Sequence, residues 1–275
     1  MRMNPKKIVV LAGTLITIAS LILSLVVTGA QENEKKEDGK PDILFYCSFD
    51  GTIKPEIQAG EEGYKGTDPA EFTKGLKGKA LVTGNSKNAI YSLKGNINIT
   101  EGTIKFWVMP IDWNADENLF HHFLRIPEPR PEQKKGVRVF DLLLYKYIDK
   151  SEVLAFGMGD ELTNTGIITI PLDKTWSPGN WHQIAFTWDS KGATLYADGV
   201  GKSQRYFVGP PDTLIAQTFT VGGPYFVENK TLTAIDELYI LSRKLSDQEI
   251  NQAYKTELVE GVMTNRFQAS PKSGQ

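Results

Sequence analysis

A segment in the second half of the chain, GNWHQIAFTWDSKGATLYADGVGKS (residues 179–203), contains a histidine, two aspartates and a serine, the residue types of a hydrolytic triad. In a triad the histidine takes the proton of a serine, which in one common form sits on a sharp strand-to-helix turn. Ser190 lies instead in the turn signal DSKG, and Asp198 precedes a glycine, as in a two-residue hairpin. We therefore predict that Asp189 and Asp198 are turn residues and that His182 is a partly buried residue bonded to a nearby carbonyl.

Paired carboxylates are the second chemistry that the sequence could supply. The two carboxyl groups of a retaining glycosidase lie about 5–5.5 Å apart, a spacing that alternate residues of one strand can provide. No candidate strand carries the pattern Glu-x-Asp-x-Glu, and Asp236 and Glu237 are adjacent, so they point to opposite faces. His121 and His122 also point to opposite faces, and no third ligand stands at zinc spacing, so they fail as a zinc site. The sequence thus offers no glucanase site, while lyases that use other residues stay open as an alternative.

The elements that position these residues are short strands separated by turn signals such as DGT, SPGN, ADGV and VGGP. Alternation of apolar and polar residues predicts strands at residues 43–49, 89–91, 102–109, 121–125, 137–147, 154–158, 166–171, 181–188, 193–197, 217–221 and 234–241. One short helix is predicted in SRKLSDQEINQAY, where Ser246 and Glu249 have the spacing of a capping box. This pattern is typical of an all-β sandwich.

The first thirty residues differ from the rest of the chain. Three cations precede the uncharged run IVVLAGTLITIASLILSLVV, residues 8–27. The run is longer than a signal-peptide core of about 7–15 residues and reaches the roughly 18 residues that can span a bilayer. Residues 1–30 are therefore predicted to be a cleaved signal peptide or a retained membrane anchor, and both alternatives export the rest of the chain. Residues 31–42 are predicted as a polar linker, 43–257 as the folded domain and 258–275 as a flexible tail.

The charge and the cysteine content exclude two further possibilities, a nucleic-acid partner and an internal disulfide. The net charge is -2 at pH 7, and no stripe of basic residues stands out, so nucleic acid is not an expected partner. The single cysteine, Cys47, cannot form an internal disulfide and lies in the apolar strand LFYCSFD. We predict that it is a buried, unreactive thiol.

Six segments of the chain form a recognisable series when taken in order. They are LFYCSFDGT, GLKGKALVTG, TEGTIKFWVMPIDW, WHQIAFTWDSKGATLYADG, FTVGG and AIDELYILSRKLSDQEI. Together they resemble the strands, the glycine-rich second element and the terminal helix of laminin G-like, concanavalin A-like jelly-roll domains of secreted proteins. The resemblance spans nearly all of residues 43–254 and implies an all-β, two-sheet antiparallel jelly-roll sandwich with a short C-terminal helix. This fold hosts lectins, adhesion modules, glycosidases and lyases, so it does not define the function.

Asp236 is the carboxylate about which the resemblance says most. It shares a strand face with Leu238 and Ile240, so it points into the core if they do. A buried carboxylate is unfavourable unless it is paired, hydrogen-bonded or bound to a metal. Related sandwiches often hold a structural calcium ion here, which implies Ca²⁺ bound by Asp236, Asp50 and loop carbonyls. The alternative is an aspartate that caps turn amides or pairs with Lys or Arg.

Exposed aromatic side chains are the candidates for ligand binding, because sugar rings have apolar faces that stack on them. We predict this role for Trp113, in the loop PIDWNADENLF, and for Tyr145 and Tyr147, which share one face of VRVFDLLLYKY. For each ring the alternative is packing beneath a loop. The resemblance to lectin-like relatives implies a non-catalytic, extracytoplasmic module that binds carbohydrate. A glycosidase or lyase of the same fold and a cell-surface module that recognises protein are the other two hypotheses.

Overall fold

The computed structural model describes residues 42–127, 138–147, 152–157, 167–206, 209–223 and 230–269. The predicted export segment, residues 1–30, lies outside the described residues, as does all of the predicted linker except Asp42. Among the helices of the described ranges, none is long and apolar enough to cross a membrane.

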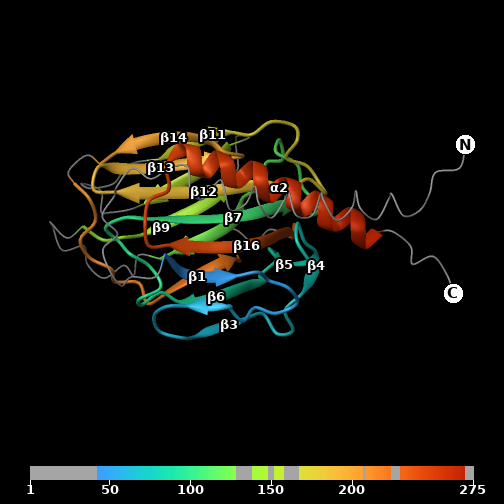
Figure 1. Cartoon of the computed structure of the whole chain (residues 1–275), viewed down its shortest axis with the longest axis horizontal. Helices are drawn as coiled ribbons and strands as arrows, with labels where there is room; N and C mark the ends of the chain where they lie inside the picture. The colour runs from blue at the N-terminus through green and yellow to red at the C-terminus, as the bar shows by residue number, and fades with distance from the viewer. Residues whose placement is uncertain are drawn as a thin grey trace, which may run out of the picture. The chain divides into compact units, whose positions relative to one another are not determined.

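The described chain is built from antiparallel strands in two sheets (Figure 1). In chain order the strands are β1 (Ile43–Cys47), β2 (Ile57–Gln58), β3 (Tyr64–Gly66), β4 (Phe72–Lys74), β5 (Lys79–Thr83), β6 (Asn88–Ser92), β7 (Gly102–Pro110), β8 (His121–Ile126), β9 (Leu142–Lys146), β10 (Glu152–Gly157), β11 (Ile168–Pro171), β12 (His182–Asp189), β13 (Gly192–Ala197), β14 (Val200–Arg205), β15 (Thr218–Gly222) and β16 (Thr233–Leu241). The nine-stranded sheet has the order β14-β13-β12-β7-β16-β1-β2, with β5 also paired to β16 and β4 to β5. The seven-stranded sheet has the order β11-β10-β9-β8-β15-β6-β3. The predicted two-sheet sandwich is confirmed.

The hydrophobic core lies between the two sheets and is rich in aromatic rings. Phe45 of β1 meets Phe219 of β15 edge to face, with ring centroids 5.1 Å apart, and neither is exposed. Tyr91 of β6 packs against both, at 4.9 Å from Phe45 and 5.2 Å from Phe219. Fully burying a large apolar side chain stabilises a fold by about 1.5–3 kcal/mol, so these contacts between the sheets contribute strongly to holding them together.

Strand β16 changes partners halfway along one edge. Its first residues, Thr233 to Ile235, pair with β5, and Leu238 to Leu241 pair with β1. The other edge pairs with β7, with a register shift between Asp236 and Tyr239. Glu237 has a positive φ of 52° at this irregularity. Asp236 therefore lies at the point of β16 where its pairing changes from β5 to β1.

The C-terminal helix, α2 (Asp247–Ala269), begins where the capping box predicts. The amide of Ser246 donates to Glu249 Oε2 at 2.9 Å, and the amide of Glu249 donates to Ser246 Oγ at 3.3 Å. The predicted helix is confirmed, but it continues to Ala269, so much of the predicted flexible tail is helical. Figure 1 shows α2 running diagonally over the sheet that holds β12, β7 and β16.

One side chain, Glu257, joins α2 to the outer face of the nine-stranded sheet. Its carboxylate accepts hydrogen bonds from Lys105 Nζ at 2.5 Å, Trp107 Nε1 at 2.8 Å and Gln183 Nε2 at 3.3 Å. Tyr254, one turn earlier, stacks on Trp107 with ring centroids 5.7 Å apart. The helix is thus held by a buried polar cluster as well as by apolar contact.

Candidate functional site

The histidine of the segment 179–203 has a structural role, as predicted. His182 Nδ1 lies 2.8 Å from Asp198 Oδ2, and Nε2 lies 3.0 Å from the Thr175 carbonyl oxygen. Both ring nitrogens therefore face oxygen acceptors, which leaves neither available to a serine. Asp189 Oδ1 accepts the amide of Lys191 at 2.8 Å, so this aspartate closes a turn. The four residues do not form a triad.

Trp113 is fully buried, which corrects the expectation of an exposed loop ring. Its Nε1 donates to Thr233 Oγ1 at 2.9 Å, and its ring stacks on His121 with centroids 3.9 Å apart. The loop folds back onto the sandwich because the amide of Leu232 donates to Asp112 Oδ1 at 2.7 Å. A ring in this position has no face to offer a ligand, so Trp113 belongs to the core.

A buried lysine fastens the same loop. Lys146 is fully buried, and its Nζ donates to the carbonyl oxygens of Glu117 and Leu119. Burial, with the Lys146 charge as a second cause, lowers the pKa of His121 to about 3, so the imidazole that stacks on Trp113 is neutral at neutral pH. Lys146 was not predicted as an anchor, although a lysine that shares a strand face with Leu142 and Leu144 is a signal that could have indicated one.

The two predicted tyrosines lie together on the outer face of the seven-stranded sheet, where they join Phe120 and His122 in what we call the aromatic patch. Phe120 is 5.7 Å from Tyr145, 5.5 Å from Tyr147 and 6.0 Å from His122 between ring centroids. Tyr145 lies 6.2 Å from Tyr147 and is 8% exposed, whereas the other three are half-buried. The patch is a set of rings held against one another, with Tyr145 as its support.

Phe120 and His122 were not predicted as site residues. Their positions follow from strand pairing, because His122 lies directly opposite Tyr145 in the β8–β9 register, and residues opposite each other share a face. Burial lowers the pKa of His122 to about 4, and the positive charge of Arg125 adds to the effect. The imidazole is therefore a neutral polar group at the edge of the rings.

Asp236 is fully buried, but not on the core face that alternation with Leu238 and Ile240 predicts. The register shift after it leaves it opposite Trp107, on the face of the sheet that α2 covers. Asp236 Oδ1 accepts the amide of Glu237 at 3.0 Å, and its Oδ2 accepts the amide of Lys77 at 3.1 Å. Asp50 Oδ1 accepts the amide of Lys79 at 2.6 Å. Both predicted metal ligands therefore face the same loop, residues 75–79, and both cap its amides.

The glycines of this loop allow the carboxylates to come close. A Cβ on Gly75 would lie 2.7 Å from Asp236 Oδ2, and one on Gly78 would lie 1.8 Å from Asp50 Oδ1. Burial raises the pKa of Asp236 to about 8, and Asp50 is among the charges that raise it further. Within the described ranges, no group of three or more His, Cys, Asp or Glu side chains could hold a metal ion, so any cation here would also need backbone oxygens.

Comparison with models of known protein families assigns the chain to one of them. Residues 77–251 match the family model described as the concanavalin A-like lectin/glucanases superfamily. The chain therefore belongs to this superfamily, as the six ordered segments predict. A comparison with curated proteins finds no match.

Solved structures with the same fold include receptor- and ligand-binding domains of toxins. The binding domain of Paraclostridial Mosquitocidal Protein 1 is 16% identical with a TM-score of 0.59, covering 78% of this chain and 52% of its own. The binding domain of botulinum neurotoxin serotype D is 15% identical with a TM-score of 0.59 and the same coverage. The serotype D ligand-binding domain in complex with N-acetylneuraminic acid is 13% identical, with a TM-score of 0.59 over 78% of this chain and 51% of its own. This chain spans about half the length of each, and the likeness is one of fold.

Proposed function

We propose that this chain is a non-catalytic, extracytoplasmic binding module that recognises carbohydrate through the aromatic patch. The observation that carries the proposal is the grouping of Tyr145, Tyr147 and a neutral His122 around Phe120. Aromatic faces stack on the apolar faces of sugar rings, while guanidinium groups donate hydrogen bonds to sugar hydroxyls. Arg125, on the same face, would supply the guanidinium.

Two further findings support this reading of the patch. The superfamily includes lectins, and one domain of the same fold was solved in complex with N-acetylneuraminic acid. The extracytoplasmic location rests on the charged start and apolar run of residues 1–30.

Changing Tyr147 to alanine is expected to weaken glycan binding about tenfold, because it removes one stacking face, an effect of about 1.4 kcal/mol. The measurement is a glycan array with the full chain, followed by calorimetric titration of the best glycan. Tyr147→Phe keeps the ring and should bind nearly as well as the unchanged chain.

The half-buried position of Tyr147 predicts that both variants melt at nearly the temperature of the unchanged chain. Equal affinity of Tyr147→Ala and the unchanged chain would rule out stacking at the patch. An array on which the unchanged chain binds no glycan would reject carbohydrate and favour protein recognition.

We also propose that Asp236, Asp50 and backbone oxygens of the surrounding loops bind a structural calcium ion. The support is a fully buried carboxylate that shares one loop with a second carboxylate. Asp50 Oδ2 accepts no hydrogen bond from the described part of the chain, so it is available as an oxygen ligand. Calcium prefers about 6–8 hard oxygen ligands, of which the two aspartates would supply the charged ones.

Calcium is expected to stabilise the fold by about 2.7 kcal/mol at a hundredfold excess over its dissociation constant. Thermal unfolding in millimolar calcium and in a chelator measures the effect, and magnesium is the control ion. Asp50→Asn should abolish the calcium-dependent shift while leaving the fold intact, since Asp50 is exposed. Identical melting curves in calcium and chelator would contradict the proposal.

A further inference from the structure

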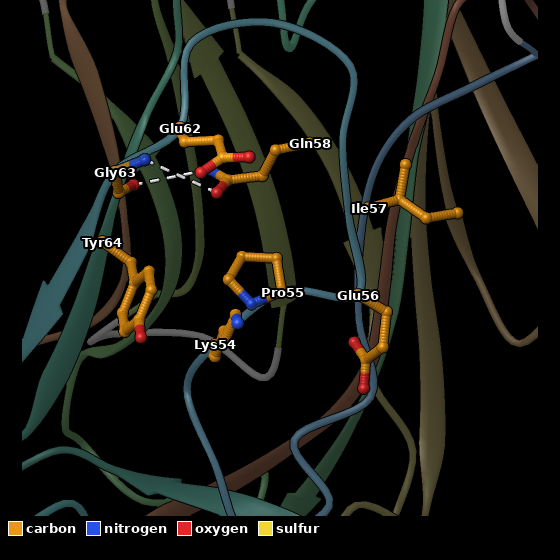
Figure 2. Close-up of a pocket in the computed structure, with 8 residues that line it drawn as sticks. All are labelled: Lys54, Pro55, Glu56, Ile57, Gln58, Glu62, Gly63 and Tyr64. Carbon is orange, nitrogen blue, oxygen red and sulfur yellow. Dashed lines mark hydrogen bonds between the residues drawn. The ribbon is translucent and has the colours of Figure 1, made fainter.

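A pocket of about 700 Å³ opens at one edge of the sandwich, away from the aromatic patch. The edge is formed by β2, the last strand in the order of the nine-stranded sheet, and β3, the last strand of the seven-stranded sheet. Its lining residues are Lys54, Pro55, Glu56, Ile57, Gln58, Glu62, Gly63 and Tyr64 (Figure 2). Small-molecule sites commonly have volumes of about 300–1,000 Å³, so the pocket is large enough for a ligand.

Strand register explains why Tyr64 and Gln58 line this pocket. Tyr64 lies opposite Tyr91, and Gln58 lies opposite Phe45. Residues directly opposite each other in antiparallel strands share a face, and Tyr91 and Phe45 both belong to the core between the sheets. Tyr64 and Gln58 therefore point toward the space between the sheets. At the edge that space is open, and Tyr64 remains 47% exposed.

One wall of the pocket is fixed in place by hydrogen bonds. Gln58 and Gly63 bond each other twice, through Gln58 Nε2 to the carbonyl oxygen at 3.4 Å and through the amide to Gln58 Oε1 at 3.5 Å (Figure 2). Asn96, which is fully buried, accepts the amide of Gly60 at 2.9 Å and donates to the carbonyl oxygen of Glu61 at 2.9 Å. A wall that is already ordered loses little entropy when a ligand binds.

The opposite wall is anchored to the core. Tyr91 Oη donates to the carbonyl oxygen of Ile53 at 3.0 Å, just before the pocket residues begin. The carboxylate of Glu56 accepts both the amide of Ser48 at 3.0 Å and its Oγ at 2.5 Å. Figure 2 shows Glu56 and Tyr64 on opposite sides of the pocket, with Pro55 between them in this view. The pocket thus exists before any ligand arrives.

The lining has the chemistry of a polyol site. One aromatic ring is exposed, and around it stand carboxylates that accept hydrogen bonds and an ammonium group that donates them. Among the described residues, neither the Glu62 carboxylate nor Lys54 Nζ forms an ion pair or a side-chain hydrogen bond, so both are available to a ligand. A flat ligand with one apolar face and many hydroxyl groups satisfies the ring and the charges together.

We propose that this edge pocket binds a single sugar residue, stacked on Tyr64 and hydrogen-bonded by Glu62, Glu56 and Lys54. This inference rests on the proposed function, from which it takes carbohydrate as the ligand class, but it concerns a second site. β15 and β6 separate β8 of the aromatic patch from β3, which amounts to roughly 14 Å across three strand spacings. The chain would therefore hold a glycan at two points.

The test is saturation-transfer NMR and titration of the full chain with free glucose, galactose, N-acetylglucosamine and N-acetylneuraminic acid. Tyr64→Ala is expected to weaken the binding of at least one of these sugars about tenfold. Glu62→Gln should weaken the binding of the same sugar, while Val200→Ala, an exposed residue of β14 at the other edge of the nine-stranded sheet, should leave that affinity unchanged. The exposure of Tyr64 and Glu62 predicts unchanged melting temperatures for both pocket variants.

The two proposals fail in different ways. If Tyr64→Ala and Glu62→Gln leave every sugar bound as before, the pocket is not a sugar site, whatever happens at the patch. If Tyr64→Ala abolishes all sugar binding and Tyr147→Ala has no effect, the pocket is the site and the patch is not. If the unchanged chain binds none of the probes and no glycan on the array, both proposals are overturned.

Discussion

Replacing Glu257 with alanine is expected to lower the free energy of unfolding by about 3 kcal/mol, the loss typical of removing one partner from a buried ion pair. The reason is that the substitution leaves a buried charge and two buried hydrogen-bond donors without their partner. Lys105, with a side chain only 9% exposed, would keep its charge beneath α2 without its partner. Trp107 Nε1 and Gln183 Nε2 would lose their acceptor in the same step. Urea unfolding measures the loss, and proteolysis within α2 should accelerate.

Glu260 provides the matched control on the same helix. It pairs with Lys77 at 3.0 Å, but the Lys77 and Glu260 side chains are 31% and 51% exposed. Exposed pairs contribute about 0–1 kcal/mol, so Glu260→Ala should change stability little. Equal effects of the two substitutions would show that the buried cluster does not hold the helix.

The second large effect is expected at Trp113. Trp113→Ala should lower the free energy of unfolding by about 3–5 kcal/mol, because it removes a fully buried ring and leaves a cavity. Thr233 Oγ1 and His121 would lose their hydrogen-bond and stacking partner as well. Chemical unfolding monitored by circular dichroism measures this loss.

Trp113→Phe keeps most of the buried area and should be less destabilised than Trp113→Ala. Tyr147→Ala, at the half-buried edge of the aromatic patch, should differ from the unchanged chain by less than about 1 kcal/mol. A Trp113→Ala chain that remains as stable as the Tyr147→Ala chain would mean that the Trp113 ring is not part of the core.

The long strands could be predicted because their periodicity is strong. In β7 and β12 the alternate residues pack into the core, and the predicted spans differ from the observed ones by only a residue at the ends. Four short strands between β1 and β6 were not predicted. Strands such as β2 and β3 have only two or three residues, which is too few for alternation to be visible. The edge pocket lies between them and was missed for the same reason.

The candidate site residues also differ in how well they could be predicted, according to whether they lie in a strand or in a loop. Tyr145 and Tyr147 share the strand face that alternation predicts, so their orientation could be predicted from the sequence. The orientation of Asp236 could not, because the register shift that follows it reverses the alternation before Leu238. Trp113 sits in a loop, where burial depends on distant partners such as Thr233 and Lys146. No local pattern contains that information. The same holds for Phe120, which precedes its strand by one residue and joins the patch only through the β8–β9 pairing.

The pairing of β1 with β16 has a consequence for how the molecule is made. Phe45 lies opposite Ile240, so strands from the two ends of the described chain lie side by side, with β16 between β7 and β1. A ribosome releases β1 long before β16 exists, and contacts between distant residues form slowly. The nine-stranded sheet therefore cannot be completed before β16 has been synthesised. A truncation before Thr233 would leave β1 and β7 each with one unpaired edge.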